Sequence, residues 1–142
     1  MLQPFFGNQR QGSTYEETKV LKVGVCQPYL SEKWDGNRVL ENKETLIRQT
    51  KFLALLDPDL IVWPEASTPY AVNLDRKWVE DLAKEANCTL MIGAVVKEGE
   101  FSYNTVSQVT LEGGLNPERY DKQVLVPFGE YVPYPFKWMP GL

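Results

Sequence analysis

Histidine is absent from the 142-residue chain, and cysteine occurs only twice, at positions 26 and 88. The absence of histidine excludes Ser–His and Cys–His catalytic pairs and the usual zinc sites, which depend on an imidazole. Two cysteines are too few for a disulfide-stabilised scaffold, and their separation fits no zinc knuckle. The chain therefore has neither the residues of a disulfide framework nor those of a zinc-binding domain.

Long hydrophobic runs and an excess of basic residues are missing as well. No stretch approaches the roughly 20 apolar residues of a membrane-spanning helix, and the first eight residues lack the apolar core of a signal peptide. Lys and Arg number 15 against 19 Asp and Glu, which gives a net charge of −4. Because nucleic-acid binding depends on clustered basic side chains, we expect no nucleic-acid partner.

The remaining composition is that of one modest globular domain, with 43% hydrophobic and 24% charged residues. Residues 1–18 are polar and read as a linker or leader. Order is expected from residue 19 onward, so we predict a single domain over 19–142. Residues 127–142 carry four prolines and are expected to form a long ordered loop.

Strand composition occurs four times along the chain. Each of these segments is rich in apolar or alternating residues and is bounded by Pro, Gly or charged turns, and they cover 20–26, 60–63, 89–96 and 101–111. After a further turn, residues 115–122 can pair back as a fifth strand. The turns at 97–100 and at Gly113-Gly114 predict that the last three strands form antiparallel hairpins.

Helical periodicity occurs twice. Over 37–56, Val39, Leu46 and Leu53 form one row and Leu40, Ile47 and Ala54 an adjacent one, which together predict an apolar stripe. A second stripe runs from Trp78 to Ala86, with Asn73 or Asp75 as the expected N-cap. The resulting order, β-α-β-α-β-β-β, favours an α/β layered fold with an antiparallel part.

The first candidate for chemistry is Glu65, in the string Trp63-Pro64-Glu65. Apolar strands of α/β sheets deliver functional groups at their carboxyl ends, and Pro64 ends the strand there. Packing near Trp63 is expected to desolvate the carboxylate and raise its pKa, as a general base near neutral pH requires. The alternative is a glutamate in a solvated turn.

The second candidate pairs Lys122, in Tyr120-Asp121-Lys122, with Glu130 eight residues later. A lysine at a strand end supplies a fixed positive charge to a developing oxyanion. The Pro/Gly turn between the two residues lets Glu130 fold back toward Lys122, and a Glu-Lys-Glu cluster would keep the ammonium charged. The alternative is a surface ion pair, worth at most about 1 kcal/mol.

Together these motifs resemble the nitrilase (carbon–nitrogen hydrolase) superfamily and, within it, the apolipoprotein N-acyltransferases. The resemblance rests on Trp-Pro-Glu, then Tyr-Asp-Lys, then the most specific string, Pro-Phe-Gly-Glu-Tyr-Val-Pro at 127–133. Gln27 and Lys33-Trp34 resemble the opening strand and loop of the family. The resemblance implies a partial α-β-β-α sandwich of the nitrilase type, with no metal and no cofactor.

The family resemblance also implies catalytic roles. Glu65 matches the glutamate that acts as general base, Lys122 the lysine that stabilises the tetrahedral oxyanion, and Glu130 the second glutamate that supports both. The family nucleophile is a cysteine that takes an acyl group from a phospholipid as a thioester. The N-terminal amine of an apolipoprotein then accepts that group, at the periplasmic side of the bacterial inner membrane.

Two departures from the family pattern matter. Val124 stands where the family often has a histidine, which we interpret as a tolerable variation. The nucleophilic cysteine of the family lies well beyond the lysine, and neither Cys26 nor Cys88 matches that position, so both are expected to be buried structural residues. We therefore expect an incomplete catalytic domain, without the membrane region and the nucleophile, that is inactive alone.

Two other functions stay open on the sequence. A soluble carbon–nitrogen hydrolase of the amidase type would share the Glu-Lys-Cys arrangement but use water as the acceptor. A degenerate fragment without catalytic activity is the other alternative.

Overall fold

A computed structural model of the chain describes residues 20–28, 36–127 and 130–131, and the elements in that part follow the order β-α-β-α-β-β-β. This order agrees with the sequence prediction. The elements are β1 (Val23–Val25), α1 (Gly36–Ala54), β2 (Leu60–Val62), α2 (Lys77–Ala86), β3 (Thr89–Glu98), β4 (Phe101–Thr110) and β5 (Gly114–Asp121).

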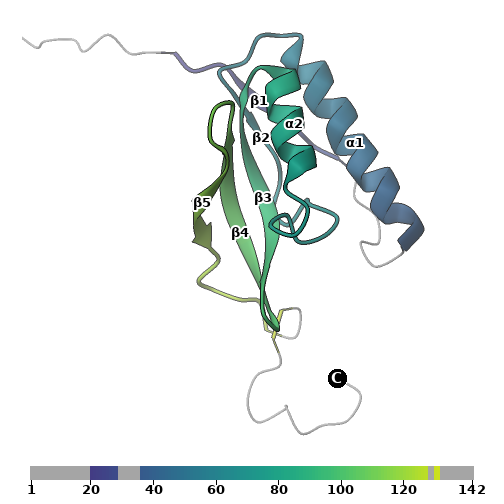
Figure 1. Cartoon of the computed structure of the whole chain (residues 1–142), viewed down its shortest axis with the longest axis vertical. Coiled ribbons are helices and arrows are strands. Elements are labelled where there is room, and N and C mark those ends of the chain that lie inside the picture. Colours follow the sequence, from purple (N-terminus) through teal and green to yellow (C-terminus); the bar gives the residue numbers. More distant parts are fainter. Residues whose placement is uncertain (1–19, 29–35, 128–129, 132–142) are drawn as a thin grey trace, which may run out of the picture.

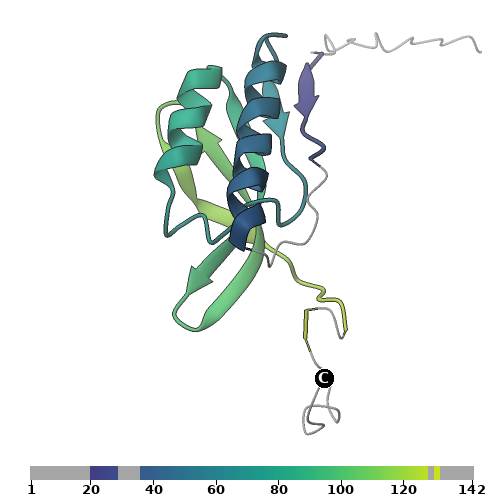
Figure 2. The same ribbon diagram turned by 90° about the vertical axis from the view of Figure 1, so that its right-hand side faces the viewer.

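The five strands form one sheet in the order β1-β2-β3-β4-β5. The first three strands pair in parallel through helical crossovers, and the last three pair antiparallel through tight turns. Both helices lie on the same face of this sheet (Figures 1 and 2). The mixed α/β class is therefore confirmed, with one helical layer and one sheet layer.

The hydrophobic core lies between the two helices and the face of the sheet that they cover. Alternate residues of β3 are fully buried there, as the period of two requires: Leu90, Ile92, Ala94 and Val96. They meet the buried stripe of α2, which consists of Val79, Leu82, Ala83 and Ala86. The predicted stripe of this helix is confirmed, and Trp78 packs against the core while partly buried.

The stripe predicted for α1 is partly wrong. Leu46 is fully buried, but Leu40 is 62% exposed. The buried line of the helix includes two polar residues, Asn42 and Thr50. The hydroxyl of Thr50 accepts a hydrogen bond from the indole of Trp63 at 3.0 Å, which compensates for its burial. Ile47 and Ala54, from the row of Leu40, still pack against the core while partly buried, so the predicted stripe fails at Leu40 and not along the whole row.

The predicted N-cap of α2 is also wrong. The helix begins at Lys77 with Arg76 at the N-cap position, and no side chain caps it. Asn73 instead exchanges two hydrogen bonds with the main chain of Lys97, and Asp75 accepts a hydrogen bond from Tyr70 at 2.8 Å. Both candidate caps are therefore used to fasten the loop that precedes the helix.

Several element ends differ from the prediction. The first strand covers 23–25 rather than 20–26, since its partner β2 is only three residues long, between Pro58 and Pro64. The first helix ends at Ala54 and the third strand continues to Glu98. The predicted leader 1–18, the pair Lys33-Trp34 and most of the loop 127–142 lie outside the described residues.

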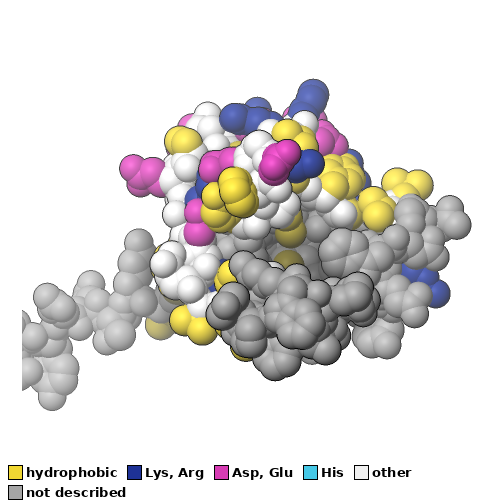
Figure 3. Space-filling model, turned by 90° about the horizontal axis from the view of Figure 1, so that it is seen from below, with side chains coloured by type: hydrophobic (Ala, Val, Ile, Leu, Met, Phe, Trp, Pro, Cys, Tyr) yellow, Lys and Arg dark blue, Asp and Glu magenta, His cyan; other side chains and the backbone are white. Residues whose placement is uncertain are grey.

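The face of the sheet opposite the helices is not covered by any described helix (Figure 1). We call it the open face, and it carries partly or largely exposed apolar side chains, namely Val25, Met91, Val106 and Tyr120. At the end of the molecule seen in Figure 3, acidic and basic side chains lie interspersed among hydrophobic ones. The described residues contain no helix long and apolar enough to cross a membrane.

Candidate active site

The three candidate residues come from three separate segments and meet at one point. Glu65 follows β2, Lys122 follows the last residue of β5, and Glu130 lies in the loop after it. The Nζ atom of Lys122 lies 2.7 Å from Oε1 of Glu65 and 3.0 Å from Oε1 of Glu130. The ammonium group therefore bridges two carboxylates, and we call these residues the charged triad.

The position of Glu65 depends on the residues just before it. Trp63 is buried, donates a hydrogen bond to Thr50 and stacks on Trp78 with 5.5 Å between ring centroids. These contacts fix the end of β2, so the chain turns at Pro64 and delivers Glu65 at the carboxyl end of the strand. The predicted placement of this residue at the strand end is confirmed.

Gly93 lets the Pro64–Glu65 segment cross closely over β3. A Cβ atom on Gly93 would lie 2.6 Å from the carbonyl carbon of Pro64 and 2.7 Å from Cα of Glu65, and would also collide with the carbonyl oxygen of Pro64. The Gly93 carbonyl accepts hydrogen bonds from the main-chain N–H of Ser67, at 2.7 Å, and from its hydroxyl, at 2.9 Å. The glycine therefore sets the height of Glu65 above the sheet.

Glu130 is held by its own loop. Its Oε2 accepts a hydrogen bond from the main-chain N–H of Val126 at 2.6 Å, and its N–H donates to the Val126 carbonyl at 2.9 Å. An isolated β-bridge between Pro127 and Tyr131 closes the same turn. This leaves Oε1 of Glu130 directed at Lys122.

The electrostatics of the triad differ from the sequence prediction at Glu65. The pKa of Glu65 is lowered rather than raised, chiefly by the hydrogen bond from Lys122. The prediction was wrong because 62% of the Glu65 side chain is exposed, so desolvation is weak against a hydrogen-bonded ammonium. Conversely, the hydrogen bonds to Glu65 and Glu130 raise the pKa of Lys122, which keeps it charged as expected.

The pKa of Glu130 is lowered too, first by the Val126 N–H and then by Lys122. All three groups are therefore ionised at neutral pH. An ionised carboxylate accepts a proton, and a permanent ammonium stabilises a negative oxygen that forms nearby. The described residues contain no cluster of three or more Cys, Asp or Glu side chains that could hold a metal ion.

Two hollows border the triad. One, of about 380 Å³, lies on the open face and is lined by Glu65, Lys122 and apolar residues that include Met91 and Val106. The other, of about 480 Å³, is lined by Glu130 together with Tyr70, Tyr103 and Leu125. Both combine an apolar wall with the charged groups at one end, which suits a substrate with an apolar body and a polar reacting group.

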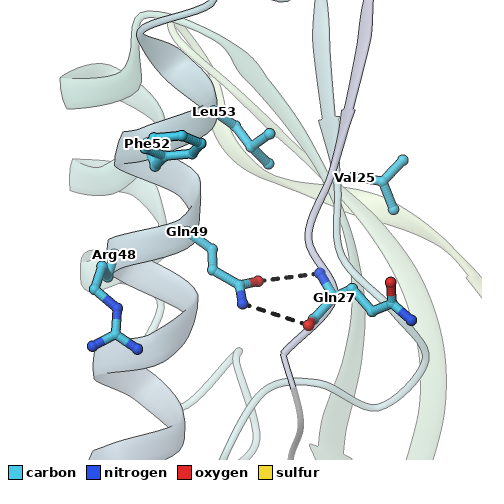
Figure 4. Close-up of a pocket in the computed structure, with 6 residues that line it drawn as sticks. All are labelled: Val25, Gln27, Arg48, Gln49, Phe52 and Leu53. Carbon is cyan, nitrogen blue, oxygen red and sulfur yellow. Dashed lines mark hydrogen bonds between the residues drawn. The ribbon is translucent and has the colours of Figure 1, made fainter.

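Another hollow of about 480 Å³ lies between α1 and β1 (Figure 4). There the Gln49 side chain accepts a hydrogen bond from the N–H of Gln27 at 3.1 Å and donates to its carbonyl at 3.5 Å. The Gln27 main chain is thus tied to the helix. This hollow shares no lining residue with those beside the triad, so we do not include it in the candidate site.

No protein-family model matches this chain. It is 37% identical over 122 residues to an apolipoprotein N-acyltransferase from Aquifex aeolicus, an alignment that covers 83% of this chain and 27% of that protein. The chain is homologous to part of the apolipoprotein N-acyltransferases. It spans about a quarter of the length of the curated relatives it matches.

Solved structures confirm the nitrilase-type fold. An amidase from Nesterenkonia sp. superposes with a TM-score of 0.62 at 17% identity, over 80% of this chain and 48% of that one. A carbon–nitrogen hydrolase from Helicobacter pylori G27 superposes with a TM-score of 0.54 at 17% identity, over 73% and 40% of the two chains. The α/β layers of this chain therefore correspond to less than half of a nitrilase-fold enzyme.

The cysteines of this N-acyltransferase homologue are both away from the triad. Cys26 is 2% exposed, and its sulfur lies 3.7 Å from the hydroxyl oxygen of Thr50. Cys88 is 3% exposed, and its thiol donates a hydrogen bond to the Pro58 carbonyl. Burial raises the pKa of both thiols, which disfavours the reactive thiolate. The expectation that both cysteines are buried is confirmed.

Two residues of the site were not found from the sequence. Gly93 stands inside an apolar strand, a pattern that often marks a close backbone approach, and this signal was available. Asn104 donates a hydrogen bond to Oε1 of Glu65 at 2.6 Å. It carries no comparable signal, because nothing in the sequence of β4 tells which polar residue of the strand faces Glu65.

Proposed function

We propose that this chain forms part of the catalytic domain of an apolipoprotein N-acyltransferase, in which Glu65, Lys122 and Glu130 assist a cysteine nucleophile. The observation that supports this most strongly is the bridging ammonium of Lys122, which brings together groups 57 and 8 positions away in the sequence. Homology to the N-acyltransferases over most of the chain gives the triad its chemical context.

In this proposal Glu65 is the general base. Its carboxylate is ionised and more than half exposed, so it is available to a thiol that approaches from the open face. General base catalysis of this kind contributes typically about 10²–10⁴-fold to a rate. The thiol itself is supplied by a segment other than those that carry Cys26 and Cys88.

Lys122 acts as the electrostatic stabiliser of the tetrahedral intermediate. Its ammonium is held by two carboxylates, so it is positioned before the reaction starts and needs no reorganisation when negative charge develops. Glu130 acts through Lys122. Its own carboxylate is fixed by the main-chain N–H of Val126, and without it the carboxylate of Glu65 alone would leave the Lys122 ammonium free to rotate.

The reaction has two balanced halves. Glu65 takes the thiol proton while sulfur attacks the ester carbonyl of a phospholipid; the C–S bond forms, the C–O bond breaks, and the proton passes to the leaving alcohol. The N-terminal amine of an apolipoprotein then attacks the thioester. Glu65 accepts a proton from that amine, the C–N bond forms, the C–S bond breaks, and the thiolate is reprotonated.

The phospholipid donor and the apolipoprotein acceptor are thus the substrates of the whole enzyme. We place that enzyme in the bacterial inner membrane, with the catalytic domain on the periplasmic side. The 142-residue chain by itself is proposed to be inactive, since neither of its cysteines reaches the triad.

A chimera tests the proposal. Residues 20–131 replace the matching segment of the Aquifex aeolicus apolipoprotein N-acyltransferase, and the purified protein receives a phospholipid and a peptide with an N-terminal diacylglyceryl-cysteine. We expect N-acylated peptide in the mass spectrum. A folded chimera that releases only free fatty acid, or that releases ammonia from a simple amide, would assign the segment to a hydrolase instead. A folded chimera that forms no product at all would reject a catalytic role.

A further inference from the structure

Asn104 contacts the triad through both its side chain and its main chain, and its side chain also helps to lower the pKa of Glu130. It lies in β4 opposite Val95 of β3 and is half-buried. Its side-chain amide donates to Oε1 of Glu65 at 2.6 Å. Its main-chain carbonyl accepts the N–H of Lys122 at 2.8 Å, directly after the last residue of β5. One residue therefore holds both the carboxylate of Glu65 and the backbone from which Lys122 extends.

The two oxygens of Glu65 are used unequally. Oε1 accepts hydrogen bonds from both the Asn104 amide and the Lys122 ammonium, at 2.6 and 2.7 Å. Oε2 accepts no hydrogen bond from any described residue. A carboxylate oxygen has about two acceptor positions, so Oε1 is saturated, whereas Oε2 keeps both of its positions as far as the described residues are concerned.

Lys122 alone would not fix the orientation of this carboxylate. An ammonium group presents three donors on a flexible stem and acts as a point charge, so it tolerates rotation of the carboxylate about its own axis. A second donor from a rigid β-strand, on the same oxygen, removes that freedom. Asn104 is such a donor, since β4 is paired on both sides, with β3 and with β5.

We infer that Asn104 is a positioning residue that, together with Lys122, holds Oε1 of Glu65 so that Oε2 is the proton-accepting atom. The inference rests on the proposed function only in naming Oε2 as the proton acceptor. The hydrogen bond from Asn104 also helps to lower the pKa of Glu65, after the larger effect of Lys122, and the nearby charge of Glu130 opposes both.

The test is a carboxyl titration of Glu65 by ¹³C NMR in the whole 142-residue chain, which needs no turnover. Asn104→Leu removes the donor at similar volume, and Asn104→Asp keeps the shape but replaces the donor by an acceptor. Gln108→Leu is the matched control, because Gln108 lies on the same strand and, four residues further on, the same face.

We expect the Glu65 titration midpoint to rise in Asn104→Leu, to rise further in Asn104→Asp, and to stay unchanged in Gln108→Leu. An unchanged midpoint in Asn104→Leu, or an equal rise in Gln108→Leu, would overturn the inference. If Asn104→Leu does not fold, Asn104→Asp decides, and an unchanged or lower midpoint there rejects the role.

The outcome is separate from that of the chimera. A raised midpoint with an inactive chimera would leave Asn104 as the residue that orients Glu65 and remove the acyltransferase proposal. An active chimera with unshifted midpoints would support the acyltransferase proposal and reject the role of Asn104.

Discussion

Replacement of Lys122 by Met in the chimera is expected to lower kcat/KM for acyl transfer by at least about 100-fold, the loss typical of removing one oxyanion stabiliser. Methionine keeps the length of the side chain but removes the charge. It also leaves the carboxylates of Glu65 and Glu130 without the ammonium that now lies 2.7 and 3.0 Å from them. The rate of N-acylated peptide formation measures the effect.

Lys84→Met is the control for that experiment. Lys84 is an exposed residue of α2, and the substitution is the same in size and charge. We expect the control to keep the rate of the unsubstituted chimera. A Lys122→Met chimera that keeps its rate within about threefold would show that transition-state charge is stabilised elsewhere.

Gly93→Ala is expected to destabilise the chain by about 2–3 kcal/mol, as overpacking does in a well-packed region. The added methyl group would meet backbone atoms of Pro64 and Glu65, which cannot move aside as a flexible side chain would. We therefore also expect Glu65 to be lifted away from Lys122. Urea unfolding of the 142-residue chain measures the loss of stability.

Gly24→Ala is the matched control for Gly93→Ala. Gly24 also lies in a strand of the same sheet, but a Cβ atom there would lie 3.4 Å from its neighbours, Ile61 and Leu53, which is ordinary contact. We expect a change of less than about 1 kcal/mol. Equal losses in both variants would mean that the approach of Pro64 to Gly93 is not the special feature of this sheet.

The order of the elements could be predicted because each has a strong local signal. The apolar run that ends at Pro64 marked β2, and the stripe from Trp78 to Ala86 marked α2. Both signals depend only on neighbours in the sequence. The N-cap of α2 could not be predicted, since Asn73 found partners in Lys97, 24 residues away.

The same distinction explains the candidate site. Glu65, Lys122 and Glu130 were found from short strings, and the structure brings them together. The direction of the Glu65 pKa shift was missed because it depends on exposure and on an ammonium 57 positions away. Asn104 was missed for a related reason: its role depends on the register of β4 against its neighbours.

The carboxylates of Glu65 and Glu130 share the ammonium of Lys122. Because both carboxyl pKa values lie below the ordinary 4.5, the cluster stabilises the fold above that pH and loses this effect as the pH falls through the lowered values. The pKa of Lys122 is raised above its ordinary 10.5, so the same stabilisation is lost at the alkaline end only as the pH rises through that raised value.

Titration of the glutamate carboxyls by NMR, with and without Lys122→Met, measures this sharing directly. We expect Glu65 and Glu130 both to titrate below the ordinary glutamate value of 4.5 in the unsubstituted chain, and Lys122→Met to raise both midpoints. Midpoints for Glu65 and Glu130 at the ordinary value that do not respond to Lys122→Met would contradict the sharing of the ammonium.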